Sequence, residues 1–216
     1  MILEVDNVEL SFNKKTILNS VYFKAEQGKI TSLIGKNGSG KSCLLEIIFG
    51  SLQPKYKLIR INKKPFLKPL HLYKNKVGFL PQHQISPSRL KIKSIFKLFG
   101  VSLNQFMIDF ESFNKYRNSR INELSSGEIR ILETYVILKS QMDIVLLDEP
   151  FSYLAPIAVF KLKELIQEEK EKKIIILTDH QYREVLDISD TCYFLSQGGT
   201  KLISSEKDLQ NQNYIS

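Results

Sequence analysis

Apolar runs and amphipathic stretches alternate through the second half of the chain. Continuous apolar runs at residues 144–147 and 174–177 are typical of strands buried on both faces. A helix is predicted after Leu124 and as far as Leu138, and a second helix opens with Pro156, a residue favoured at the first helical position. This alternation predicts an α/β fold with a parallel sheet covered on both faces.

The N-terminal region has a different pattern. Residues 1–30 contain β-rich pieces at 3–5 and 21–23 with turn-prone residues between them, and they predict short strands in an antiparallel lobe. A buried strand at 30–34 then precedes a glycine-rich loop and an apolar-periodic helix at 43–49, which Gly50 ends.

The middle of the chain predicts a helical insertion. Residues 55–81 are basic and partly β-like, and residues 90–120 predict short helices with aromatic faces. We expect the aromatic rings to form the core of this insertion, because rings that stack on bases must be exposed. At the C-terminal end, residues 191–196 and 201–204 predict a hairpin about Gly198 and Gly199. The aromatic residues are Phe96, Phe99, Phe106, Phe110 and Phe113.

Length and composition limit the class of protein. The 216 residues suit one large α/β domain, and the most strongly apolar run, 174–177, is far below the ~18 residues that span a bilayer. The first ten residues lack the basic segment of a secretory signal, so we expect a cytoplasmic protein. Neither Cys43 nor Cys192 sits in a metal-type or redox-type pair, and Cys43 is expected to be a small packed thiol without chemistry of its own.

The net charge of +8 is unevenly distributed. Residues 55–97 hold 12 Lys or Arg and no Asp or Glu. A solvated basic surface and a face near anionic headgroups explain this block equally well, and a nucleic-acid footprint ranks behind both.

A glycine-rich loop carries the first chemistry. The eight residues after the 30–34 strand match G-x-x-x-x-G-K-[ST] and lie between a strand and a helix, as a phosphate-binding loop requires. Its backbone N–H groups can converge on phosphates, Lys41 would neutralise the β and γ phosphates, and Ser42 would offer a hydroxyl to Mg²⁺. The loop is Gly35, Lys36, Asn37, Gly38, Ser39, Gly40, Lys41 and Ser42.

Two carboxylates end the buried strand at 144–147. Asp148 can hold Mg²⁺, and Glu149 can orient or deprotonate an attacking water. An acidic turn after a strand is common, so this pair gains its meaning from the phosphate loop upstream.

Three further pieces complete a pattern. Gln82 follows residues 78–81, the segment 124–128 reads Leu-Ser-Ser-Gly-Glu, and His180 follows Thr178 and Asp179. Their order and spacing resemble the ATP-binding cassette (ABC) family over almost the whole chain. Residues 124–128 and 178–180 look, within that family, like the lipopolysaccharide-export and branched-chain amino-acid cassettes.

The resemblance implies a fold and its boundaries. The fold would be α/β, a P-loop NTPase core with a mostly parallel sheet, an N-terminal antiparallel β lobe and a small helical subdomain. Residues 1–216 would form a single ABC ATPase domain, with the β lobe at 1–30 and the helical subdomain at about 88–140.

The resemblance also implies an activity. The chain would be the ATP-binding and ATP-hydrolysing subunit of an ABC transporter, peripheral on the inner face of the cell membrane. Its partners would be an integral membrane subunit and a second cassette that closes head to tail on ATP, whereas nucleic acid is not expected. ATP and Mg²⁺ would be the cofactors.

The family motifs map onto three sets of residues. Glu149, His180 and Lys41 would be catalytic, and Ser42, Gln82 and Asp148 would hold the metal. The ATP-binding set would comprise Phe12, which would stack on adenine, Gly35, Lys36, Asn37, Gly38, Ser39, Gly40, Lys41, Ser42 and Cys43, together with Ser125, Ser126, Gly127 and Glu128.

Three positions depart from the family pattern. Ser126 replaces a glycine, Glu128 replaces a glutamine, and Ala155 stands where the loop after the two acids usually has an aspartate. The first two changes leave Ser125, Gly127 and the backbone donors in place. Ala155 keeps open a cassette that binds ATP without turnover, and the basic block keeps open a cassette that acts on nucleic acid or ribosomes.

Overall fold

The protein is described here by a computed structural model that covers residues 1–203 and 206–211. Residues 204–205 and 212–216 belong to the expected 1–216 domain and lie outside the described residues, as does the last residue of the expected 201–204 strand.

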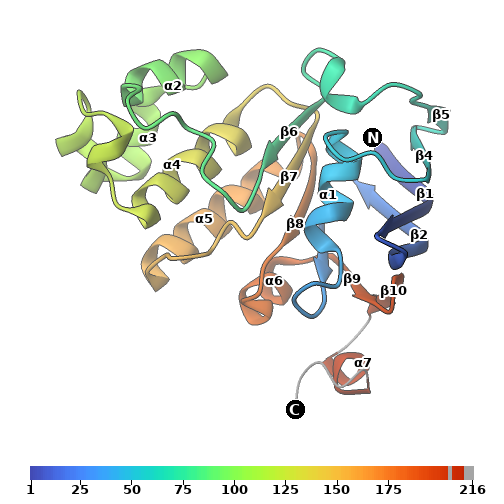
Figure 1. Cartoon of the computed structure of the whole chain (residues 1–216). Helices are drawn as coiled ribbons and strands as arrows, with labels where there is room; N and C mark the ends of the chain where they lie inside the picture. The colour runs from blue at the N-terminus through green and yellow to red at the C-terminus, as the bar shows by residue number, and fades with distance from the viewer. Residues whose placement is uncertain (204–205, 212–216) are drawn as a thin grey trace.

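A six-stranded sheet forms the centre of the fold (Figure 1). Its order is β10-β9-β3-β8-β7-β6, and all neighbours are parallel except the terminal hairpin of β9 and β10. Every residue of β3, β7 and β8 is buried, which confirms the two strands expected from the continuous apolar runs and the buried strand expected at 30–34. The strands are β3 (Ile30–Ile34), β6 (Val77–Leu80), β7 (Ile144–Asp148), β8 (Ile174–Thr178), β9 (Thr191–Ser196) and β10 (Gly199–Ile203).

A second, antiparallel sheet has the order β2-β1-β4-β5. The sequence predicted short strands within residues 1–30, but β1 and β2 have 11 and 12 residues. The β1–β2 pairing continues past register shifts, and Asn7 and Ser20 have φ 50° near these shifts. Polar residues at these positions interrupt the alternation of apolar and polar residues, so the sequence indicated shorter strands. The sheet also takes two strands from beyond residue 30. Its strands are β1 (Ile2–Phe12), β2 (Lys15–Glu26), β4 (Tyr56–Ile61) and β5 (Lys64–Pro65).

Helices connect successive strands along the chain and lie around the central sheet (Figure 1). α1 begins at Lys41, two residues before the expected start, and ends at Gly50, whose φ of 102° requires a residue without a side chain. Among residues 1–203 and 206–211, no helix is long and apolar enough to cross a bilayer. The helices are α1 (Lys41–Phe49), η1 (Leu70–Leu72), α2 (Ile92–Phe99), α3 (Leu103–Asp109), η2 (Glu111–Tyr116), η3 (Ile121–Glu123), α4 (Ser126–Lys139), α5 (Pro156–Glu169), α6 (Tyr182–Ile188) and α7 (Glu206–Asn211).

The short helices between β6 and α4 have an aromatic core. The rings of Phe96, Phe106, Phe110 and Phe113 are buried and lie 4.8 to 6.2 Å from one another or from the ring of Tyr135 on α4. This contact confirms that the aromatic faces predicted from the sequence are structural. α4 therefore contacts both the aromatic core of the short helices and, with its other side, the central sheet.

Candidate functional site

The glycine-rich loop connects β3 to α1 at the carboxyl edge of the central sheet. A Cβ on Gly35 would lie 2.4 Å from the carbonyl oxygen of Leu195, and a Cβ on Gly40 would lie 2.9 Å from the side chain of Leu18. Gly40 also has φ 106° as the residue that precedes the helix. Close packing and backbone conformation therefore both require glycine, and a glycine loop that leads into a helix N-terminus can offer its N–H groups to an anion.

Lys41 lies inside this loop. Its side chain is buried, and its Nζ donates to the carbonyl oxygen of Gly35 at 2.9 Å and to that of Lys36 at 3.4 Å. Burial lowers the pKa of this ammonium, while the carboxylates of Asp148 and Glu149 act to raise it. The loop thus holds a cation next to its own backbone donors, an arrangement that suits a polyphosphate.

Asp148 ends β7 with its carboxylate buried. Burial raises the pKa of this carboxyl to about 6, and a hydrogen bond from the Ser42 side chain opposes the rise. Ser42 and Asp148, assigned to one metal from the sequence, therefore lie together.

Glu149 is the meeting point of three side chains. Its Oε2 accepts from Gln82 Nε2 at 3.0 Å and from Ser152 Oγ at 3.1 Å, and His180 Nδ1 lies 3.7 Å away. The backbone of Glu149 is left-handed, with φ 56°, and its N–H donates to Thr178 at 2.6 Å. A non-glycine residue held in this conformation directly after a buried strand is typical of a functional position.

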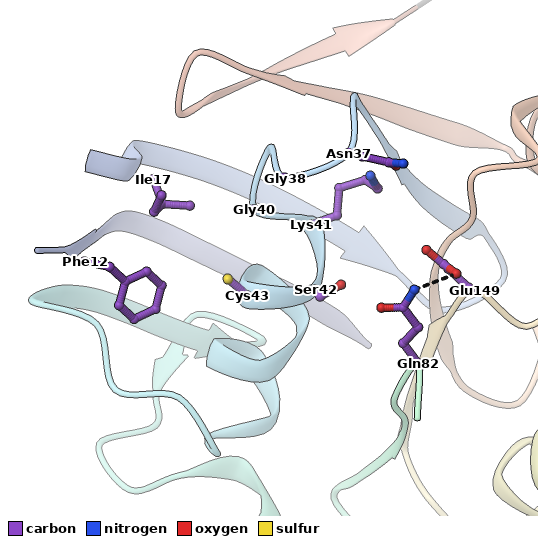
Figure 2. Close-up of a pocket in the computed structure, with 10 residues that line it drawn as sticks. All are labelled: Phe12, Ile17, Asn37, Gly38, Gly40, Lys41, Ser42, Cys43, Gln82 and Glu149. Atoms are coloured by element: carbon purple, nitrogen blue, oxygen red, sulfur yellow. Dashed lines mark hydrogen bonds between the residues drawn. The ribbon is translucent and has the colours of Figure 1, made fainter. Parts of the chain in front are cut away.

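The loop and the carboxylate line one cavity of about 430 Å³. Figure 2 shows Phe12 and Ile17 on one side of the glycine-rich loop and the hydrogen-bonded pair of Gln82 and Glu149 on the other. The ring of Phe12 is half exposed at this edge. Cys43, expected to be a packed thiol, is only partly buried and also faces the cavity. The lining residues are Phe12, Ile17, Asn37, Gly38, Gly40, Lys41, Ser42, Cys43, Gln82 and Glu149.

Residues 124–128 lie outside that cavity. Ser125 caps α4, with its hydroxyl accepting from Glu128 N at 3.3 Å and donating to Glu128 Oε2 at 2.8 Å. Burial acts to raise the pKa of Glu128, but the hydrogen bonds from Ser125 outweigh it and hold that pKa below its usual value. The glutamate that replaces the family's glutamine thus closes a capping box onto the serine.

Gly127 and Ser126 are not equivalent in this segment. A Cβ on Gly127 would lie 2.7 Å from the carbonyl oxygen of Tyr153, whereas Ser126 is exposed and lines a second cavity of about 250 Å³. The loop after Glu149 packs against α4 at this point. Serine is therefore accommodated at position 126, and only glycine fits at position 127.

Sequence reasoning missed two charged residues of α4. Arg130 donates to the carbonyl oxygens of Pro81, Asp148 and Glu149. Glu133 Oε1 accepts from the backbone N–H groups of Ile85 and Ser86, a few residues after Gln82. Both side chains are buried. The available signal was two opposite charges one turn apart in the mostly apolar stretch 129–138.

Asp179 was also missed, although it directly precedes His180. Its carboxylate is fully buried and accepts from Phe151 N at 2.9 Å and from Gln181 N at 3.0 Å. Burial raises the pKa of Asp179. The residue joins the loop after Glu149 to the segment that carries His180.

Comparison with known proteins gives consistent matches. The family model described as ABC transporter matches residues 18–152. An uncharacterized ABC transporter ATP-binding protein of Methanocaldococcus jannaschii is 28% identical over 207 residues, covering 91% of this chain and 74% of that protein. The lipopolysaccharide export system ATP-binding protein LptB of Escherichia coli K12 is 27% identical over 211 residues, covering 91% and 87%.

Solved structures match over nearly the same extent. An ATP-binding subunit of an ABC transporter superposes with a TM-score of 0.84 at 22% identity, covering 99% of this chain and 94% of that chain. A putative ABC transporter ATP-binding protein of Pyrococcus furiosus gives a TM-score of 0.74 at 28% identity, covering 90% and 98%. The first of these likenesses concerns the fold alone.

Proposed function

Because the chain belongs to the ABC transporter family, we propose that the cavity between Phe12 and Glu149 is where it binds and hydrolyses ATP. The chain is an ATP-binding subunit with ATPase activity, and a separate membrane-spanning protein is its partner. The observation that carries the site assignment is a cavity lined both by the glycine-rich loop and by the Gln82–Glu149 pair.

The nucleotide enters this cavity with its base toward β1. Phe12 offers a half-exposed ring at the edge where adenine would stack, and the phosphates follow the loop toward Glu149. Ser39 supports this orientation, since its hydroxyl is buried in the loop without a hydrogen-bond partner among the described residues. A phosphate oxygen would satisfy that hydroxyl together with the loop N–H groups.

Glu149 is the group that prepares the attacking water. Hydrogen bonds from Ser152 and Gln82 hold its carboxylate at the cavity. His180 Nδ1 approaches the same carboxylate oxygen, so Glu149 and His180 can both contact the γ-phosphate region. Lys41 balances the charge that develops on the phosphate oxygens. In this role Glu149 accepts the proton of the water as the water attacks the γ-phosphorus and the bond from that phosphorus to the β–γ bridging oxygen breaks, which releases ADP.

Mg²⁺ fits the residues at the loop end of β7. Ser42, Asp148 and Gln82 supply oxygen atoms, the donors this ion prefers, and no group of three or more His, Cys, Asp or Glu forms a metal cage within residues 1–203 and 206–211. An ion held by few protein oxygens takes its other ligands from phosphate and water. Bound there, Mg²⁺ would neutralise charge on the β and γ phosphates.

A second cassette completes the site. Ser125, Ser126, Gly127 and Glu128 form the start of α4 and do not line the cavity that holds Lys41, so they serve the nucleotide of a paired subunit. The N-terminus of α4 offers N–H groups to that nucleotide. ATP therefore closes the two cassettes on each other, and hydrolysis reopens them.

The membrane partner fixes the location of the chain, which we assign to the cytoplasmic face of the cell membrane. Residues 1–216 act as one ATPase domain, with the antiparallel lobe at 1–30 and the helical subdomain at about 88–140. The shared aromatic core of α2, α3, η2 and α4 supports the helical subdomain. The pairing of β4 with β1 extends the antiparallel sheet beyond residue 30.

Two substitutions test the proposed mechanism. Glu149→Gln keeps the shape of the side chain but cannot accept the proton, so it should bind ATP, lose at least about 100-fold in turnover and accumulate as a dimer. Lys41→Ala removes the phosphate-binding cation and should stay monomeric with ATP. Size-exclusion chromatography with and without ATP measures the dimerisation of both variants, and phosphate release measures their turnover. Glu164→Gln, which changes an exposed carboxylate on α5, is the control. If neither variant changes ATP-dependent dimerisation, the proposed site is wrong.

A further inference from the structure

The basic charge of the chain is concentrated in one part of the sequence. No acidic residue occurs between Glu46 and Asp109, and residues 55–97 hold 12 of the 31 Lys and Arg. The rest of the chain has 19 basic and 23 acidic residues, a net charge of −4. The overall excess of positive charge therefore arises entirely from this block.

Most cations of the block are exposed and have no counter-charge. Three are neutralised locally: Lys55 by Glu9, Arg60 by Glu4 and Asp6, and Lys76 by Asp143. Eight others have exposed side chains and form no ion pair with a residue of 1–203 or 206–211. These are Lys63, Lys64, Lys68, Lys74, Arg89, Lys91, Lys93 and Lys97.

These cations lie on segments that share one edge of the molecule. Figure 1 shows β5, the loop with η1 that follows it, and α2 along the upper edge, while α6 and α7 lie at the opposite end. The segments that carry these cations therefore gather toward one end of the molecule, away from α6 and α7. We call the eight unpaired cations, with the segments that carry them, the basic face.

Exposed leucines interrupt the basic face. Leu67 is 89% exposed, Leu72 is 63% exposed and Leu98 is 75% exposed, and each has a lysine next to it or two residues away. Single exposed leucines are common on protein surfaces, but beside lysines they give this face apolar groups that can enter the headgroup region of a bilayer.

Of the Phe and Tyr rings within residues 55–97, Phe96 is buried and Phe66, Tyr73 and Phe79 are partly buried. Tyr56 is 53% exposed, with the Lys55 ammonium over its ring, so successive bases would find no row of rings to stack on there.

We propose that the basic face lies directly against anionic lipid headgroups, a contact made by this subunit itself in addition to its contact with the membrane partner. Seven of the eight cations are lysines, whose compact charges suit many weak contacts with mobile headgroups rather than one fixed bidentate site. The proposal does not depend on the nucleotide site, since none of these residues lines the cavity.

Vesicle co-sedimentation of the full chain without nucleotide tests the proposal. The chain should bind phosphatidylcholine vesicles that contain phosphatidylglycerol and not bind vesicles of phosphatidylcholine alone. The triple variant in which Lys68, Lys93 and Lys97 are each replaced by Gln should have a partition coefficient at least tenfold lower, because three attractions to the anionic surface are lost. The matched control replaces three exposed lysines elsewhere, Lys14, Lys15 and Lys201, and reaches the same net charge.

The outcomes separate the alternatives. A loss in the first triple variant and not in the second supports a defined face. Equal losses in both variants, or equal binding to both kinds of vesicle, would overturn the proposal, and so would tighter binding to single-stranded DNA or RNA than to anionic vesicles at the same salt concentration.

The exposed leucines are tested at high salt, which screens the lysines. The double variant Leu67→Gln, Leu98→Gln should weaken the binding that persists at high salt, whereas Ile157→Gln, at an 81% exposed residue on α5, should not. Lys41→Ala should bind vesicles normally, which separates this test from the test of the ATP site.

Discussion

Arg130 and Glu133 lie one turn apart on α4 and hold the two ends of the segment that carries Gln82. Arg130 Nη1 donates to the carbonyl oxygen of Pro81 at 2.7 Å. Glu133 Oε1 accepts from Ile85 N at 3.0 Å and from Ser86 N at 2.7 Å. Ser125 caps the same helix. A displacement of Gln82 is therefore tied to a displacement of the helix end that we propose faces the second nucleotide.

Glu133 should stabilise this connection measurably. Glu133→Ala leaves two buried N–H groups without an acceptor and should lower the free energy of unfolding by about 2 kcal/mol. Glu133→Gln keeps an oxygen acceptor at the same place and should cost less than half as much. Urea denaturation measures both. A Glu133→Ala variant as stable as the wild type would mean that the Gln82 segment does not depend on this carboxylate.

The sequence predicted the central sheet well because continuous apolar strands and the phosphate-loop motif depend on local chemistry. β7 and β8 each contain a continuous apolar run that can be recognised on its own, and β3 is recognised by its place before the phosphate loop. The extent of β1 and β2 was not predictable in the same way, since bulges at Asn7 and Ser20 interrupt the two-residue period. Pairing of β4 with β1 is a contact between distant segments, which no local pattern encodes.

The site shows the same division. The cavity collects Lys41, Gln82 and Glu149 from three separate motifs, each found from the sequence. Arg130 was not found, because its partners are backbone carbonyls, which look the same at every residue. Buried charges that serve backbone groups are recognised only when the chain is folded.

Gly127 should be far less replaceable than its neighbour. In Gly127→Ala the new Cβ would lie 2.7 Å from the carbonyl oxygen of Tyr153, so α4 or the loop after Glu149 must shift. We expect ATP-dependent dimerisation and turnover to fall at least about tenfold, since a displacement near 1 Å can cost this much or more. Ser126→Gly, which removes an exposed side chain, should leave both within about twofold, and equal losses in the two variants would contradict this explanation.

Asp148 should make the nucleotide-free protein less stable as the pH rises. Its pKa is raised from 3.8 to about 6, so between these values the native state holds a proton that the unfolded chain has released. Stability therefore falls with increasing pH across that window and is constant above it. Asp148→Asn removes the titration, and its stability relative to the wild type should rise by roughly 2 to 3 kcal/mol from pH 4 to pH 7. Urea denaturation with a chelator present measures this difference, and a difference that does not change with pH would contradict the assignment.

Lys173 should be the most stabilising lysine outside the site. Its buried Nζ donates to the carbonyl oxygens of Leu138 at 2.7 Å and Ser140 at 3.0 Å, and it lies 3.0 Å from Glu169 Oε2. It thereby satisfies carbonyl groups that the end of α4 leaves without helical partners. Lys173→Met should lower the free energy of unfolding by about 3 kcal/mol, because it removes these bonds and one counter-charge of a buried carboxylate.

Lys172 provides a matched control for this prediction. Its Nζ lies 3.2 Å from the other oxygen of the same Glu169 carboxylate, but its side chain is 69% exposed against 5% for Lys173. Water already solvates the Lys172 ammonium, so Lys172→Met should change stability by less than about 1 kcal/mol. Equal costs at the two positions would mean that the ion pair with Glu169, which both lysines form, determines the effect. A large cost at Lys173 alone would assign it to burial and to the two carbonyl groups at the end of α4.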